Sequence, residues 1–198
     1  MRPGSWGLAS GWAVWITGLP SSGKSTISRL LAKKLEEKGI RVQVLESDEL
    51  RRVLTPRPKY TEEERDWFYH VMAWIGWLLV KNGTNVIFDA TANKRAYRER
   101  ARQLIGPERF AEVYVRCPLE VCMARDVKGI YKLALEGKAS TVPGLQVPYE
   151  EPLNPAVVVD TSVMGPEECV ELIMRKILEL FYGGGEPTPD IRPSLPRS

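Results

Sequence analysis

The sequence contains few of the residues that usually mark a metal or redox centre. It has one histidine, His70, and three cysteines, Cys117, Cys122 and Cys169. The cysteines lack the spacing of a zinc site or of a Cys-x-x-Cys pair. We therefore expect reduced structural thiols.

An excess of charge of one sign is also missing. The 28 basic and 25 acidic residues give a formal charge of +3. Such a small excess makes no general case for a nucleic-acid partner. With 43% hydrophobic and 27% charged residues, the composition is ordinary for a soluble globular protein.

Long hydrophobic segments are absent too. The apolar run Val71–Val80 has ten residues, whereas a helix that spans a bilayer needs about 20. We interpret the run as a buried helix, with His70 as a packing residue. The opening residues, MRPGSWGLASG, lack the apolar core of a signal peptide. We expect a cytoplasmic protein without a membrane partner.

The strongest motif is a complete P-loop, in which Gly18 and Gly23 enclose four residues and Lys24 and Ser25 follow. An apolar run precedes it and a helical pattern follows, as the motif requires. Backbone N–H groups of such a loop bind phosphate oxygens, the lysine reaches the β- and γ-phosphates, and the serine hydroxyl ligates Mg²⁺. A bound triphosphate is expected to contact Gly18, Leu19, Pro20, Ser21, Ser22, Gly23, Lys24, Ser25 and Thr26.

The order of the elements indicates an α/β fold. Strand patterns alternate with helical ones, which implies a parallel sheet with helices on both faces. The expected strands are residues 12–17, 40–47, 84–91, 109–117 and 155–161, and the expected helices are residues 26–38, 61–83, 94–105, 118–126 and 166–181. Gly39 is a C-cap signal, and Thr61 with Glu64 forms a capping box. We predict the three-layer P-loop NTPase fold with a five-stranded sheet.

A single domain is expected to account for most of the 198 residues. We place an N-terminal extension at residues 1–11 and the main domain at residues 12–182. Residues 183–198, GGGEPTPDIRPSLPRS, are rich in Gly and Pro and are expected to form a disordered tail.

Carboxylates follow two of the strands, at the edge of the sheet where such folds bind their ligands. Asp48 follows the second strand and is a candidate to take a proton from an acceptor hydroxyl or to hold Mg²⁺ through water. Capping of the next helix is the alternative, and the two roles are compatible. For Asp89, which ends the third strand, a metal or water-positioning role and a structural hydrogen bond are both open.

Arginines are abundant where an anionic acceptor would lie. The planar guanidinium donates two parallel hydrogen bonds to phosphate or sulfate. The candidates are Arg51, Arg52, Arg65, Arg95 and Arg98. Some of them are expected to form solvated faces, and the sequence does not distinguish these from the arginines that contact substrate.

The segment Cys117–Thr161 resembles adenylylsulfate kinases. It carries the family elements PLEVC, Arg-Asp-x-Lys-Gly-x-Tyr-Lys, Pro-Tyr-Glu-x-Pro and a last strand that ends in Asp-Thr. The resemblance implies transfer of the γ-phosphate of ATP to the 3′-hydroxyl of adenosine 5′-phosphosulfate (APS), giving PAPS in sulfate assimilation. It also implies a mobile lid at about residues 126–152 and, because the family is commonly dimeric, a homodimer.

The resemblance also implies roles for individual residues. Lys24 follows the transferring phosphoryl group, Asp48 is the catalytic base, and Ser25 ligates Mg²⁺. Arg125 and Thr161 belong to the nucleotide site. The expected acceptor site consists of Asp48, Arg51, Tyr60, Arg65, Arg95, Lys128 and Val142, and Lys132 is expected to reach phosphate or sulfate oxygens.

The chain departs from the family pattern at the acceptor site. Phe68 stands where the family has Asn, Ala92 where it has a serine that can be phosphorylated, and Val142 where it has a Phe that packs on the acceptor adenine. A kinase of another small alcohol or of a polynucleotide end stays open, because residues 88–102 also resemble the Asp-x-Thr segment of those enzymes. A P-loop regulatory ATPase is a third alternative, although an Asn-Lys-x-Asp guanine-specifying segment is missing.

Overall fold

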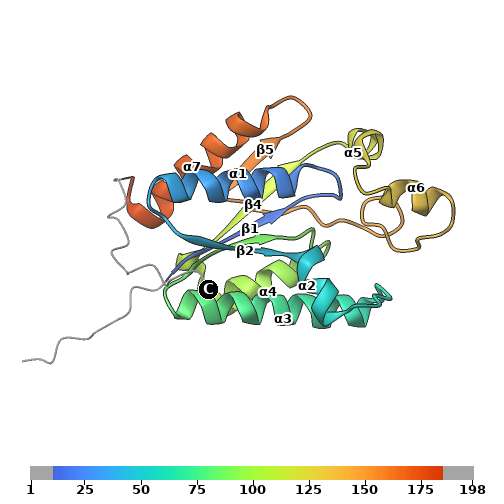
Figure 1. Ribbon diagram of the computed structural model, residues 1–198, viewed down its shortest axis with the longest axis horizontal. Helices are drawn as coiled ribbons and strands as arrows, with labels where there is room; N and C mark the ends of the chain where they lie inside the picture. Colours follow the sequence, from blue (N-terminus) through green and yellow to red (C-terminus); the bar gives the residue numbers. More distant parts are fainter. Residues whose placement is uncertain (1–10, 185–198) are drawn as a thin grey trace, which may run out of the picture.

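The computed structural model describes residues 11–184, and its framework is a parallel sheet (Figure 1). The strands are β1 (Ala13–Thr17), β2 (Val42–Glu46), β3 (Asn85–Asp89), β4 (Phe110–Arg116) and β5 (Val157–Asp160), in the order β2-β3-β1-β4-β5. Every neighbouring pair is parallel, so the carboxyl ends of the strands meet at one edge. The predicted five-stranded α/β fold is confirmed.

Helices cover both faces of this sheet (Figure 1). One face carries α1 (Lys24–Glu37) and α7 (Pro166–Tyr182), and the other carries α3 (Glu62–Lys81) and α4 (Arg95–Ile105). The shorter helices lie toward the end of the molecule to which the strands point; they are α2 (Ser47–Leu54), α5 (Leu119–Arg125) and α6 (Ile130–Leu135). A 3-10 turn, η1 (Pro107–Arg109), leads into β4.

The two faces of the sheet form two separate apolar cores. Because side chains alternate along a strand, Val14 and Ile16 of β1 belong to the core under α1 and α7, whereas Ala13 and Trp15 belong to the core under α3 and α4. In the second core the rings of Trp15 and Phe88 stack with their centroids 4.5 Å apart. β1 is therefore the central strand of both cores.

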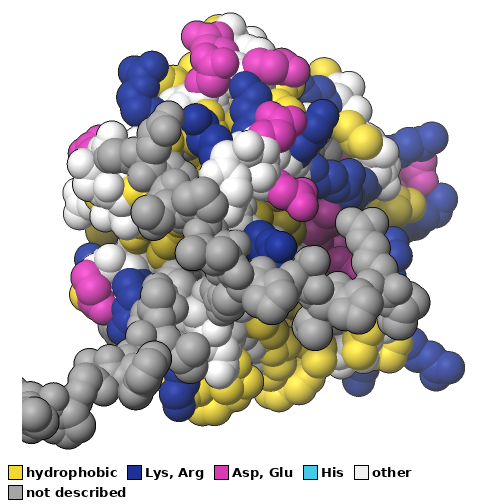
Figure 2. Space-filling model, turned by 60° about the vertical axis from the view of Figure 1, so that its left-hand side comes forward, with side chains coloured by type: hydrophobic (Ala, Val, Ile, Leu, Met, Phe, Trp, Pro, Cys, Tyr) yellow, Lys and Arg dark blue, Asp and Glu magenta, His cyan; other side chains and the backbone are white. Residues whose placement is uncertain are grey.

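The helix α3 is buried along one side only. Phe68 and Met72 are fully buried, whereas Trp67 and Trp74 are 49% and 46% exposed. His70 is exposed as well, so the expectation that it packs in the interior is wrong: the apolar run continues around the helix onto its solvent side. Figure 2 shows hydrophobic side chains along the lower edge of the molecule, where α3 lies, and mixed basic and acidic side chains above them. Among the described residues, no helix is long and apolar enough to cross a membrane.

The predicted N-terminal extension and disordered tail lie outside the described residues, apart from Gly11 and residues 183–184. The amide of Gly11 donates a 3.0 Å hydrogen bond to the carbonyl of Val80 at the end of α3. The chain therefore enters the sheet beside the C-terminal end of that helix.

Gly76 allows α3 to approach the sheet closely. A Cβ atom at this position would lie 2.1 Å from Cζ and 2.6 Å from Cε1 of Phe88. We expect Gly76→Ala to lower the free energy of unfolding by about 1–3 kcal/mol through overpacking. This loss should outweigh the gain of about 1 kcal/mol that Ala gives over Gly in a helix. Chemical denaturation measures the change.

The matched background for this test is Phe88→Leu, which removes the ring that the new methyl group meets. In that background Gly76→Ala should be neutral or stabilising. Equal destabilisation in both backgrounds would contradict a steric origin.

Candidate active site

The P-loop lies between the end of β1 and the start of α1, as predicted. Gly23 has φ +97°, a backbone conformation that favours glycine. At Gly18 a Cβ atom would lie 2.4 Å from the carbonyl oxygen of Val115, so only glycine fits beside β4. The hydroxyl of Ser22 is buried without a hydrogen-bond partner among the described residues. The loop thus combines a helix N-terminus with an unpaired polar atom, as a phosphate site requires.

Lys24 is held inside this loop. Its side chain is only 8% exposed, and its Nζ donates a 2.7 Å hydrogen bond to the carbonyl oxygen of Leu19. Burial lowers the pKa of Lys24 to about 8, although the nearby charge of Asp89 acts in the opposite direction. The ammonium therefore lies in a site where a bound anion would stabilise its protonated form.

Asp89 ends β3 directly beside the loop. It is 4% exposed, and burial raises the pKa of its carboxyl group, whereas the charge of Lys24 and a hydrogen bond from Ser25 lower it. The structure therefore brings Lys24, Ser25 and Asp89 together at the base of the P-loop. Sequence reasoning left the role of Asp89 open, because its neighbours Lys24 and Ser25 come from α1, far away in the sequence.

The donors at this point suit Mg²⁺ better than a softer metal. A serine hydroxyl and a carboxylate are hard oxygen ligands, and Mg²⁺ is commonly held by few protein groups together with phosphates and water. Within residues 11–184 there is no cluster of three or more His, Cys, Asp or Glu side chains that could hold a metal by itself. Ser25, with Asp89 behind it, is compatible with an ion that arrives with a triphosphate.

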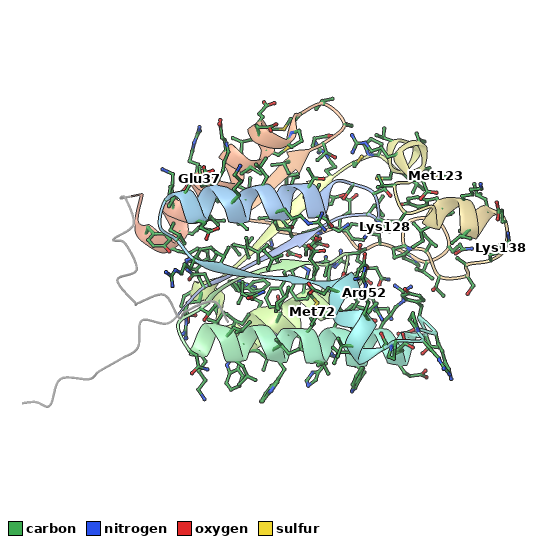
Figure 3. All side chains as sticks on the ribbon, in the orientation of Figure 1. Glu37, Arg52, Met72, Met123, Lys128 and Lys138 are labelled. Atoms are coloured by element: carbon green, nitrogen blue, oxygen red, sulfur yellow. The ribbon has the colours of Figure 1, made fainter. Side chains whose placement is uncertain are left out.

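Asp48 lies in the first turn of α2 and pairs with Lys128 from the lid. The N-cap of α2 is Glu46, and no side chain caps the helix, so the alternative that Asp48 is a capping residue is wrong. The carboxylate of Asp48 accepts a hydrogen bond from Nζ of Lys128, and both side chains are more than half exposed. Figure 3 shows Lys128 on the loop that leads from α5 to α6, at the carboxyl-end edge of the sheet. Two predicted site residues are thereby brought into contact.

Arg51, Tyr60 and Arg65 form a second group next to Asp48. Arg51 and Arg65 are only 8% and 9% exposed, and their guanidinium carbons lie 5.0 and 5.4 Å from the ring centre of Tyr60. Glu64 lies 3.4 Å from Nη1 of Arg51. Burial lowers the pKa of Arg65, and the charge of Arg51 adds to this effect. Of these two buried cations only Arg51 pairs with a carboxylate among the described residues, so the cluster is attractive to an anion.

Glu64 organises this pocket in a way that the capping-box motif only partly predicts. The hydroxyl of Thr61 does accept a 3.2 Å hydrogen bond from the amide of Glu64. The Glu64 carboxylate, however, accepts from the amides of Lys59 and Tyr60, at 2.7 and 3.2 Å. It thereby holds Tyr60 at φ +54°, an uncommon conformation for a residue with a side chain.

Arg95 and Val142 are not brought into contact with this pocket. The side chain of Arg95 is 46% exposed, and its Nη1 donates to the carbonyl of Glu151 at 3.2 Å. Val142 is 3% exposed and packs in an apolar cluster with Cys122 of α5 and Tyr131 of α6. The aromatic ring available in the pocket is that of Tyr60, which is 40% exposed.

Arg52 and Arg98, the other two arginines considered from sequence, differ from each other. Arg52 is exposed on α2 (Figure 3). Arg98 is 2% exposed, pairs with Glu112 and donates a 2.6 Å hydrogen bond to the carbonyl of Glu150. Arg98 therefore fixes the segment before β5 onto α4.

Arg125 and Thr161 contact each other, and Thr161 contacts the P-loop. Arg125 donates to the carbonyl and the hydroxyl of Thr161, at 2.6 and 3.2 Å, and the Thr161 hydroxyl donates to the carbonyl of Ser22 at 2.7 Å. The predicted nucleotide residues thus form a continuous chain of contacts with the loop.

Sequence reasoning missed the residues that attach the lid to the body of the protein. Tyr131 donates a 3.0 Å hydrogen bond to the carbonyl of Pro20, and Asn93 donates one of 3.0 Å to the carbonyl of Pro148. The helix α6 was also missed. It begins after Gly129 because the Asp126 carboxylate accepts from the amides of Tyr131 and Lys132, at 3.1 and 2.9 Å. Tyr131 and Lys132 do belong to a family motif, which was the available signal.

A P-loop at the edge of a parallel sheet, with a basic lid and a cationic pocket beside it, defines a phosphotransferase of the P-loop kinase class. Residues 10–160 match the family model of adenylylsulphate kinase. The chain belongs to the adenylylsulfate kinase family.

Named relatives agree with this assignment. The chain is 41% identical over 172 residues to a probable adenylyl-sulfate kinase of Pyrococcus abyssi, an alignment that covers 87% of this chain and 98% of the relative. It is 47% identical over 149 residues to that of Archaeoglobus fulgidus, covering 75% of this chain and 95% of the relative. The APS kinase CysC of Mycobacterium tuberculosis, solved in complex with AMPPNP and APS, superposes with a TM-score of 0.80 at 30% identity, covering 85% of this chain and 98% of that one.

The lowered pKa of Lys24 leads to a prediction about pH. A protonated Lys24 attracts a triphosphate, and its pKa of about 8 means that the free protein loses this charge as the pH rises through 8. The affinity for AMPPNP, measured by equilibrium titration between pH 7 and pH 9.5, should therefore fall above about pH 8. Lys24→Met should bind more weakly and lose this part of the pH dependence. The same slope in both proteins would show that another group titrates.

The pH dependence of folding stability at Lys24 has the opposite sign to that of triphosphate affinity. Between about pH 8 and 10.5 the folded protein binds fewer protons at Lys24 than the unfolded chain does. The contribution of Lys24 to stability therefore becomes more favourable as the pH rises through that window.

Proposed function

We propose that the protein transfers the γ-phosphate of ATP to the 3′-hydroxyl of APS and forms PAPS, as the family resemblance implies. The single observation that supports this acceptor most is the pair of buried arginines, Arg51 and Arg65, next to the P-loop. A phosphosulfate group offers several anionic oxygens, and guanidinium groups bind such oxygens in pairs. A neutral alcohol would leave Arg65 without a counter-charge and Arg51 with Glu64 alone.

ATP would be held at the P-loop. The backbone amides of residues 18–26 would surround the phosphates, and Lys24 would exchange its hydrogen bond to Leu19 for the β- and γ-oxygens. Arg125 and Thr161 would face the nucleoside end, because their contacts continue from the loop at Ser22. When bound, Mg²⁺ would neutralise charge on the β- and γ-oxygens, with Ser25 as ligand and Asp89 behind it.

Asp48 is the residue that we assign as the general base. It is exposed at the edge between the P-loop and the arginine pocket, where an acceptor hydroxyl would lie. Lys128 pairs with it from the lid and would move to the transferring phosphoryl oxygens as Asp48 accepts the proton. Closure of the lid would then exclude water from the reaction.

The adenine of APS would meet Tyr60 rather than residue 142. The Tyr60 ring is partly exposed next to both arginines, whereas the Val142 side chain is buried inside the lid. A Tyr60–adenine contact would be worth roughly 0.5–1.5 kcal/mol, the range for aromatic pairs. Assembly as a homodimer stays a prediction from the resemblance, and a cytoplasmic location stays a prediction from the sequence.

A phosphate-transfer assay tests the acceptor. With γ-labelled ATP and Mg²⁺, the wild-type protein should label APS, and it should not label small alcohols or oligonucleotide ends at a comparable rate. Turnover of another hydroxyl compound, with no transfer to APS at millimolar concentration, would overturn the proposal.

Asp48→Asn should lower kcat for APS by roughly a hundredfold or more, since general-base catalysis contributes about 10²–10⁴. The KM for ATP should hardly change. Glu49→Gln is the matched control, because it removes the neighbouring exposed carboxylate and should leave kcat unaltered. Activity that survives in Asp48→Asn but collapses in Asp89→Asn would move the base to the end of β3.

A further inference from the structure

The guanidinium of Arg51 rests on a buried aromatic ring. Its central carbon lies 3.8 Å from the ring centre of Phe68, which is closer than its distances to Tyr60 (5.0 Å) or Tyr69 (5.8 Å). Phe68 is fully buried in the core between α3 and the sheet. A ring in that position cannot move aside, so the plane of the guanidinium has one face on a fixed support.

The edge of the guanidinium is fixed at one nitrogen only. Nη1 donates to the hydroxyl of Thr55 at 3.3 Å and to the carboxylate of Glu64 at 3.4 Å. Glu64 is itself held by the amides of Lys59 and Tyr60. Both hydrogen bonds that the Arg51 side chain makes to described residues thus start from Nη1, and Nε and Nη2 are left for a ligand.

We propose that Phe68 is a positioning residue for the acceptor: its ring holds Arg51 flat, with the free Nε–Nη2 edge set to receive the acceptor's anionic group. This inference rests on the proposed function. A free arginine side chain loses rotamer entropy when it is fixed in place. A site that fixes it before binding does not incur this cost in the complex. At Phe68 the family pattern has Asn, an amide that could hydrogen-bond a ligand itself; Phe68 acts only through Arg51.

The contact also sets a preference among acceptors. A cation over a desolvated aromatic face is attracted by the ring and keeps its charge. Phe68 can donate no hydrogen bond, so the recognition at this point depends on negative charge in the acceptor. Acceptors that carry a phosphate or phosphosulfate should gain from Phe68, and uncharged alcohols should not.

Steady-state kinetics with APS and ATP test the inference. Phe68→Leu should raise the KM for APS about tenfold, while kcat and the KM for ATP stay within about twofold. Phe110→Leu is the matched control: it removes an equal ring from the same core, at the amino-terminal end of β4, away from the site. It should lower stability without changing the KM for APS.

A double-mutant cycle separates positioning from general packing. Arg51→Ala should weaken APS binding by itself, and adding Phe68→Leu to Arg51→Ala should produce no further change in KM. If Phe68→Leu raises the KM for APS equally with and without Arg51, or if Phe110→Leu raises it as much, Phe68 does not act through Arg51. A KM that stays within twofold in Phe68→Leu would also overturn the inference.

A spectroscopic measurement on the wild-type protein does not depend on the acceptor, and its one variant, Arg51→Lys, serves only to assign the signal. The Nε–H proton of Arg51, assigned by comparison with Arg51→Lys, should resonate upfield of the other arginines because it lies over the Phe68 ring. An Arg51 signal without a ring-current shift would overturn the inference. If wild-type protein fails to phosphorylate APS but shows this shift, the proposed acceptor fails and the positioning of Arg51 by Phe68 stands.

Discussion

The active site depends on a buried lysine that has a buried carboxylate beside it. An isolated charge in a protein interior costs several kcal/mol, whereas a pair with hydrogen bonds offsets much of that cost. Lys24 comes from the first turn of α1 and Asp89 from the end of β3. They meet because β1 and β3 are adjacent and parallel, with Ile16 opposite Asp89. A slip of one residue in this register would turn Asp89 to the other face of the sheet.

The parts of the site that could be predicted from sequence are those that are contiguous in the chain or fixed by the sheet. The P-loop is a single segment, and its strand and helix neighbours are visible in the same stretch. The edge rule for parallel sheets then placed Asp48 and Asp89 at the right end of their strands. The lid contacts could not be predicted in this way. Lys128 and Asp48 are separated by 80 residues, and Arg65 and Thr141 by 76, so only the folded chain brings them together.

The arginines show a second limit of sequence reasoning. Arg51 and Arg98 look alike in a helical pattern, and both are buried. Arg98 has a carboxylate, Glu112, and two backbone carbonyls as partners, so its charge is used within the fold. Arg51 shares the Glu64 carboxylate with the backbone amides of Lys59 and Tyr60. What distinguishes a binding arginine from a structural one is the supply of acceptors around it, and that supply is set by tertiary packing. His70 illustrates the same limit, because periodicity alone did not identify which side of α3 faces solvent.

The two arginines that we propose for acceptor binding differ in the same respect, the supply of hydrogen-bond acceptors around them. Arg65 donates from Nε to the carbonyl of Tyr60 and from Nη2 to Thr141 in the lid, with Nη1 3.5 Å from the amide oxygen of Asn93. Its three nitrogens are therefore all occupied, and the contact from Nη2 joins the lid to α3. Arg51 has one occupied nitrogen and a ring beneath it. An incoming anion meets unused donors at Arg51, whereas at Arg65 it must compete with the lid. In the proposed function, Arg51 would present the charge that attracts the acceptor, and contact of the acceptor with Arg65 would depend on the position of the lid.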